Sequence, residues 1–125
     1  MASRPILPPF PVITNGDMSQ ATITSAVTVI QNVSMLSYDI SWSGTSPVGA
    51  MTVQVSNTYK QNADGTVANA GNWTTLALSA AAPVSGNTGN GFIDVDGTAG
   101  YAIRLVYTKT SGTGTLNVIA SGKVF

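Results

Sequence analysis

The chain has 125 residues, of which only 8% are charged, and its five Lys and Arg balance its five acidic residues to a formal net charge of zero. This length fits one domain with a single hydrophobic core, and so low a charge argues against binding to nucleic acid or an anionic membrane surface, because both need a basic field. With neither Cys nor His in the sequence, disulfides, thiol catalysis and the usual zinc sites are excluded, and we expect no cofactor.

The N-terminal segment combines many prolines with apolar side chains. Residues 1–13 hold four of the six prolines of the chain. Each proline fixes its own φ, removes a backbone donor and favours an extended conformation in the residue before it. The segment is therefore unsuited to a helix or a central strand, and we expect residues 1–18 to form an extended arm outside a domain of residues 19–125.

The arm is predicted to bind another protein. Its apolar content differs from the polar composition of disordered tails, and its prolines reduce the entropy lost when an extended segment docks. Packing along its own domain is the alternative. We expect Phe10 to be among the anchors, and the full set of predicted partner-binding residues is Pro5, Ile6, Leu7, Pro8, Pro9, Phe10, Pro11, Val12 and Ile13.

The remainder of the chain repeatedly alternates apolar and polar residues, most clearly in the sequence LSYDISW at residues 36–42. A period of two indicates strands with one buried and one solvated face. We expect strands at residues 21–30, 36–42, 50–56, 73–78, 91–95, 101–109 and 114–124, separated by turn-forming residues. This pattern predicts an all-β fold, a single antiparallel β-sandwich or jelly-roll-like domain of seven to eight strands.

Two of the connections are distinctive. The run Ser111-Gly-Thr-Gly114 predicts a tight hairpin between residues 101–109 and residues 116–119. The long polar stretch of residues 58–72 predicts a protruding loop or a ragged hairpin.

Groups suited to catalysis or metal binding are scarce. Asp94 and Asp96 are the closest pair of acids, and alternate positions on a strand place both carboxylates on one face. We interpret them as solvated residues that discourage pairing at a strand end; the alternative is a Ca²⁺ site completed by Asp64 or backbone carbonyls. Ser and Thr are abundant but lack a neighbouring base, so we expect no enzyme.

Two further side chains are candidates for contact with a ligand or partner. We expect Trp73 to pack in the core or at its edge, as large rings usually do in a small domain; stacking on a sugar ring, with Tyr59 and the 58–72 loop, is the alternative. Arg104 alternates with Ile103 and Leu105 and so faces outward, where an ion pair with an Asp is expected and contact with a partner is the alternative.

Residues 100–123, GYAIRLVYTKTSGTGTLNVIASGK, are similar to stretches of phage and prophage virion proteins. The composition is rich in Gly, Ser, Thr, Asn and Val, and an extended arm is expected on a β domain. In both respects the chain resembles the small accessory proteins of tailed-bacteriophage virions, above all capsid decoration or cement proteins. No run of about 20 apolar residues and no basic-then-apolar start is present, so we expect neither a membrane span nor export.

The resemblance implies a non-enzymatic virion protein, assembled in the host cytoplasm, that stabilises the phage head through its arm. Its implied partner is the major capsid protein or another virion protein, and it would act as a homo-oligomer or in many copies, without direct contact with nucleic acid or membrane. Two alternatives remain: a tail, fibre or appendage module that binds a glycan or receptor, and a component of the tail or the head–tail connector.

Overall fold

A computed structural model describes residues 6–30, 35–76, 83–96 and 101–123, which form ten strands and no helix. Eight strands join in one antiparallel sheet, and the other two, β5 and β6, form a small sheet of their own. The strands are β1 (Ile6–Asp17), β2 (Thr22–Thr24), β3 (Thr28–Val29), β4 (Met35–Ser56), β5 (Lys60–Gln61), β6 (Val67–Asn69), β7 (Thr74–Leu76), β8 (Pro83–Val84), β9 (Thr88–Asp96) and β10 (Ala102–Lys123).

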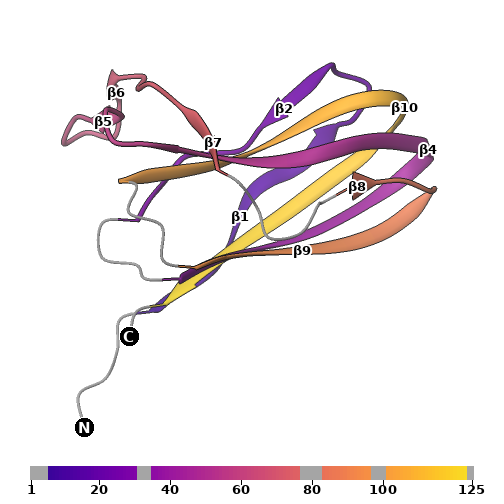
Figure 1. The fold of residues 1–125 in the computed structure, drawn as a ribbon, viewed down its shortest axis with the longest axis horizontal. Helices are drawn as coiled ribbons and strands as arrows, with labels where there is room; N and C mark the ends of the chain where they lie inside the picture. The colour runs from indigo at the N-terminus through magenta and orange to yellow at the C-terminus, as the bar shows by residue number, and fades with distance from the viewer. Residues whose placement is uncertain (1–5, 31–34, 77–82, 97–100, 124–125) are drawn as a thin grey trace, which may run out of the picture.

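The fold is organised by two long strands, β4 and β10, of 22 residues each. They pair antiparallel along their whole length, from Ala102 opposite Ser56 to Lys123 opposite Met35. Figure 1 shows both ribbons running through the upper part of the molecule, bending at its right-hand end and returning through the lower part. A single two-stranded ribbon folded over on itself therefore contributes to both layers of the structure.

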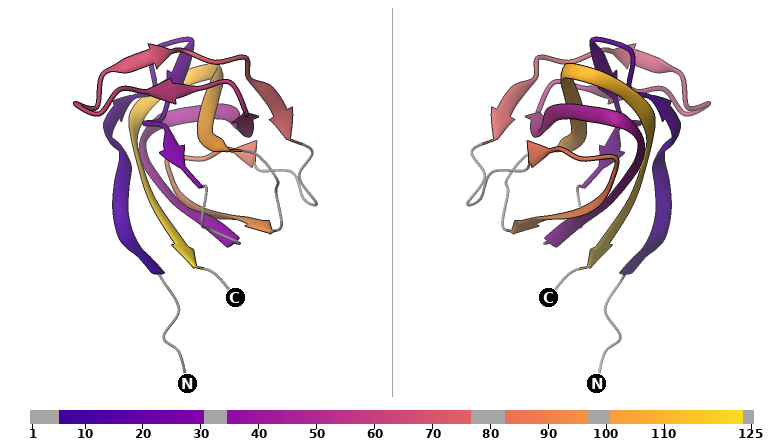
Figure 2. Two further views of the ribbon diagram at one scale, coloured as in Figure 1. Left: turned by 90° about the vertical axis from the view of Figure 1, so that its left-hand side faces the viewer. Right: turned by 90° about the vertical axis from the view of Figure 1, so that its right-hand side faces the viewer.

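The remaining strands complete the two layers. In the lower layer of Figure 1, β1 pairs with residues 115–123 of β10, and β9 pairs with residues 35–43 of β4. In the upper layer, β2 and β3 pair with the first half of β10, and β7 and β8 with the second half of β4. The end-on views in Figure 2 show the layers facing each other, and the predicted antiparallel β-sandwich is confirmed.

The core lies between the layers, and the period-two alternation predicts its members. Leu36, Tyr38, Ile40 and Trp42 are all buried, as the LSYDISW pattern requires. In β10 the same alternation buries Leu116, Val118 and Ala120, whereas its first half buries Ala102 and Val106 in addition to Ile103, Leu105 and Tyr107. The core cluster consists of Val12, Ile13, Met18, Ile30, Leu36, Tyr38, Ile40, Trp42, Met51, Val53, Val84, Ile93, Val95, Ile103, Leu105, Tyr107, Leu116, Val118 and Ala120.

The bend in β10 replaces the hairpin expected at residues 111–114, and that expectation is wrong. The strand continues through this segment with two register shifts, between Lys109 and Thr113, and Gly112 has a φ of 83°. Turn-forming residues 43–47 of β4 lie opposite and include Ser46, with a φ of 48°. Because both paired strands carry flexible residues at the same level, they bend together as a bulged corner instead of folding back separately.

The N-terminal segment is part of the sandwich from Ile6 onward. The expected arm of residues 1–18 outside a domain of residues 19–125 is therefore corrected. As β1 it forms an edge strand on β10, from Ile6 opposite Lys123 to Asp17 opposite Thr115. Val12 and Ile13 are 7% and 6% exposed in the core. Packing along its own domain, the alternative, is thus what the described residues adopt. An edge strand tolerates prolines because their missing N–H groups need no ladder partner.

The other expected elements differ in detail. The strand expected at residues 21–30 is interrupted and becomes β2 and β3, while β9 is longer than the expected strand at 91–95. The expected strand at 73–78 appears as β7, and residues 77 and 78 lie outside the described residues. The ragged hairpin expected within residues 58–72 is confirmed as the irregular β5–β6 pair.

The core position of β1 predicts a large effect for a substitution in the proposed arm. Replacing Ile13 with Ala should lower the free energy of unfolding by about 2–5 kcal/mol, because it removes buried methyl groups and leaves a cavity. The exposed neighbour Thr14 is the matched control, and Thr14→Ala should change that free energy by about 0.5 kcal/mol or less. Urea denaturation measures both; equal, small effects would contradict the packing of β1.

The bulged corner of β4 and β10 predicts a large loss of stability when Gly112 is replaced. A Cβ there would collide with the backbone of Ser46 and Pro47, whereas one at Gly65, which also has a positive φ, would meet nothing. Gly65→Ala should therefore cost about 1–2 kcal/mol of stability for its left-handed backbone alone. Gly112→Ala should cost at least about 1 kcal/mol more, from the added overlap. Thermal unfolding of the two variants compares them, and similar losses would argue against the corner.

Candidate interaction surface

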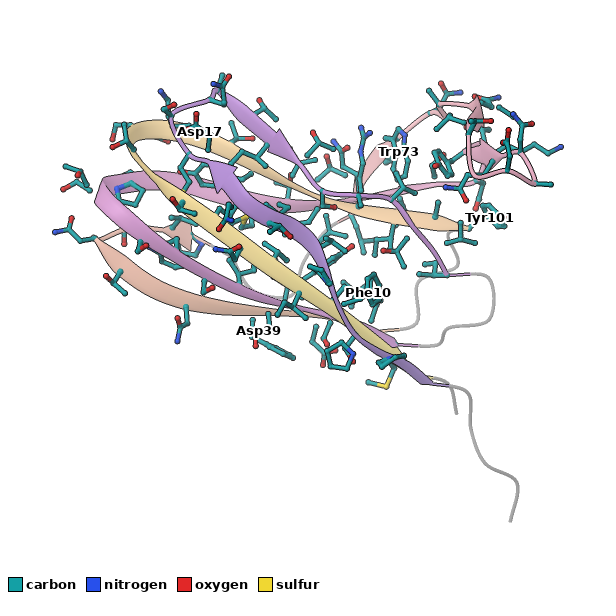
Figure 3. The ribbon with its side chains drawn as sticks, turned by 180° about the vertical axis from the view of Figure 1, so that it is seen from behind. Phe10, Asp17, Asp39, Trp73 and Tyr101 are labelled. Atoms are coloured by element: carbon teal, nitrogen blue, oxygen red, sulfur yellow. The ribbon has the colours of Figure 1, made fainter. Side chains whose placement is uncertain are left out.

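The nine predicted partner-binding residues differ in how far the structure exposes them. Pro8, Pro9 and Pro11 are exposed, and Phe10 is half-buried, lying between the layers and packing against the core (Figure 3). Val12 and Ile13 are buried, so the folded chain does not offer them to a partner, which corrects their assignment. Ile6 and Leu7 lie in β1 opposite Lys123 and Gly122, and Pro5 falls outside the described residues.

The exposed prolines adjoin a row of side chains that crosses the lower layer from edge to edge. Pro11 of β1 is opposite Ile119 of β10, Ile119 is opposite Asp39 of β4, and Asp39 is opposite Phe92 of β9. Phe92 is 66% exposed and Ile119 45%. Figure 3 shows Asp39 pointing away from the other layer. We call these four residues the outer row.

The outer row is apolar except for one carboxylate. Its three apolar members span strands from both edges of the layer, and Asp39 carries the only charge in it. A hollow of about 240 Å³ adjoins its Phe92 end, and the residues that line the hollow are Met35, Leu36, Ser37, Phe92, Asp94, Ser121 and Gly122. Exposed apolar side chains gathered in this way favour contact with another protein.

The sequence analysis did not predict that the side chains of Phe92 and Ile119 are exposed, although a pattern in the sequence indicates it. Each stands directly beside a buried apolar residue, in the pairs Phe92-Ile93 and Val118-Ile119. Consecutive apolar residues in an alternating strand must point to opposite faces. One member of each pair therefore has to lie on the outer face, which makes such pairs a usable sign of a surface with an apolar patch.

A second cluster lies on the upper layer, around Trp73. The guanidinium carbon of Arg104 is 4.2 Å from the centre of the Trp73 ring, and the Tyr59 ring centre is 5.8 Å from it. The Arg104 Nε donates to Gln54 Oε1 at 2.8 Å, and the described residues give Arg104 this partner rather than the expected ion pair with an Asp. Trp73 Nε1 donates to the Ala70 carbonyl at 2.8 Å.

These contacts give Trp73 an internal role. One face of the ring is covered by a cation, and its N–H is engaged by the chain, so the ring anchors the β5–β6 hairpin to the upper layer. Tyr59, its proposed companion in sugar stacking, is only 6% exposed. Figure 3 shows Trp73 and Tyr101 at the same end of the upper layer. A hollow of about 330 Å³ lies there, lined by Asn57, Thr58, Tyr59, Lys60 and Tyr101.

The acidic residues do not gather into a metal site within the described part of the chain. No group of three metal-binding side chains of the His, Cys, Asp and Glu types is found there. Asp64 instead caps its own turn: its carboxylate accepts hydrogen bonds from the Thr66 backbone and hydroxyl, which lower the pKa of Asp64. Asp94 is exposed on β9, and the calcium hypothesis gains no support from Asp64.

No helix among the described residues is long and apolar enough to cross a membrane. Comparison of the chain with protein-family models and with curated proteins finds no match. Function is therefore inferred from the chemistry of the chain's own surface.

The Trp73 cluster predicts a local loss of stability. Replacing Trp73 with Ala removes the ring beneath Arg104 and one hydrogen bond, and should lower the opening free energy of residues 57–72 by about 2 kcal/mol. Hydrogen exchange of those amides should accelerate while exchange in β10 stays unchanged. Trp73→Phe keeps a ring beneath Arg104 and should give an intermediate effect. Unchanged exchange in Trp73→Ala would contradict the anchoring role.

Proposed function

We propose that this chain is a non-enzymatic structural protein of a tailed-phage virion, a capsid decoration or cement protein. It binds the major capsid protein, or another protein of the assembled head, through the proline-bearing edge of β1 and the outer row. The observation that carries the proposal is the exposed apolar side chains of Ile119 and Phe92, which lie with Pro11 on the outer face of the lower layer. This exposed apolar surface, together with the similarity of residues 100–123 to phage virion proteins, favours permanent contact between proteins over enzymatic chemistry.

The proline-bearing edge favours contact through side chains. Pro8, Pro9 and Pro11 cannot donate a backbone hydrogen bond, and β1 has register shifts around them. A strand with these features resists the addition of another strand. The partner would therefore cover the prolines and Ile119 with its own apolar side chains, and full burial of a side chain such as Ile119 contributes roughly 1.5–3 kcal/mol.

Anchoring of β1 in the core gives the proposed role a mechanical basis. Val12 and Ile13 hold the contact strand within the sandwich, and β1 is paired with β10 from Ile6 to Asp17. Force applied at the edge would pass directly into the sheet instead of stretching a tether. A rigid body of this kind, bound across a junction between head subunits in many copies, would oppose the pressure of packaged DNA.

A charge placed in the outer row tests the proposal. Ile119→Lys should leave the fold intact, because the side chain is exposed, yet weaken binding to heads that lack this protein at least about tenfold, since the contact loses an apolar side chain and must desolvate an ammonium group beside Asp39. Co-sedimentation with head particles of the encoding phage measures the binding. Thr115→Lys lies on the same strand and face and is the matched control. Wild-type binding by Ile119→Lys, or no binding by the unaltered protein, would overturn the proposal.

A further inference from the structure

The strand β9 forms the opposite edge of the lower layer from β1, as Figure 1 shows. It pairs with β4 without a register shift, from Asp96 opposite Met35 to Thr88 opposite Ser43. No strand pairs with its other side within the described residues. Of the usual features that protect an edge from pairing, β9 lacks proline, basic residues and bulges and carries only acidic residues.

The phase of the hydrogen-bond ladder identifies which backbone groups of β9 face outward. Gly44 N donates to the Asn87 carbonyl at 2.7 Å, and this residue pair extends the β4–β9 register by one step. Bonded and non-bonded pairs alternate along an antiparallel ladder. Residues 89, 91, 93 and 95 therefore bond to β4, while Asn90, Phe92 and Asp94 direct their N–H and C=O groups to the open edge.

The side chains of these three residues are exposed, as is that of Thr88, and the order of the three is self-complementary. If two β9 strands pair antiparallel about a two-fold axis at Phe92, Phe92 faces its copy and Asn90 faces Asp94 of the second copy. The backbone groups that point to the open edge then meet one another. Each Asn90 amide can donate to an Asp94 carboxylate, twice in the pair, and the two phenyl rings form an aromatic pair.

Other registers lose this match. Moving the axis by one residue, to Ile93, preserves the backbone ladder but places each Phe92 ring opposite an Asp94 carboxylate and separates Asn90 from Asp94. Moving it to Asp94 brings two like charges directly opposite each other. Asp94 thus discourages most pairings at this edge, as expected for a protective acid, and permits the one in which Asn90 lies across from it.

We propose that two copies of this chain associate edge to edge through β9, in a two-fold dimer whose lower layers form one continuous sheet. The occupant of the edge is a second copy because the complementarity is internal to the strand. An unrelated strand would have to supply an amide donor and a carboxylate at matching distances on either side of an apolar residue. The inference does not depend on the proposed virion role, since it concerns the isolated protein.

An exchange of two side chains tests both the interface and its register. In Asn90→Asp, each Asp94 faces another carboxylate, and dimerisation should weaken roughly tenfold or more. Adding Asp94→Asn to that variant restores an amide opposite a carboxylate with the two positions exchanged, and the double variant should recover the dimer. Sedimentation equilibrium of the full chain over a wide concentration range measures each dissociation constant, and circular dichroism verifies that each variant is folded.

Two more variants separate side-chain from backbone contributions. Phe92→Lys should give a monomer by opposing two ammonium groups, whereas Asn117→Lys, on the same layer in β10, should dimerise like the unaltered chain. Asn90→Pro removes an N–H that faces the open edge and leaves the β4 ladder intact, and should also be monomeric. A wild-type chain that is monomeric throughout, a dimer insensitive to Asn90→Asp and Phe92→Lys, or no recovery in the exchange variant would each overturn the proposal.

Discussion

The continuous pairing of β4 with β10 is the constraint on which the rest of the structure depends. Each other strand of the large sheet pairs with one of these two: β1, β2 and β3 with β10, and β7, β8 and β9 with β4. Because the paired strands bend together at Ser46 and Gly112, a single ladder sets the register of both layers. A slip of one residue would turn the apolar side chains of both layers away from the core. The buried faces of both layers therefore fix the register of β4 on β10.

The two edges of the lower layer differ in what they can bind. Prolines and bulges in β1 block strand addition and leave apolar side chains for contact, whereas β9 presents an uninterrupted row of backbone donors and acceptors. A dimer joined through β9 would carry a β1 edge at each end of its sheet. Two such edges on one rigid body suit a repetitive partner, since simultaneous binding at both raises the effective affinity without any new contact.

The sequence identified the N-terminal segment as unusual but could not assign its contacts. Proline content predicts an extended backbone, and apolar content predicts burial, but neither says against which surface. Val12 and Ile13 pack in the chain's own core while Pro8 and Pro11 remain exposed. That division follows from the register of β1 on β10, which joins residues about a hundred positions apart. The outer row arises in the same way, because Phe92, Asp39 and Ile119 become neighbours only through strand pairing.

By itself, the sequence determined the all-β class, the buried face of each long strand and the positions where the backbone can turn. These properties are local, since alternation and glycine conformation depend on a few adjacent residues. Tertiary structure alone decided that residues 111–114 form a corner and that residues 6–17 form an edge strand. Gly112 permits either a hairpin or a bend, and the choice falls to the bend because β4, paired across from it, carries its own flexible residues at the same level.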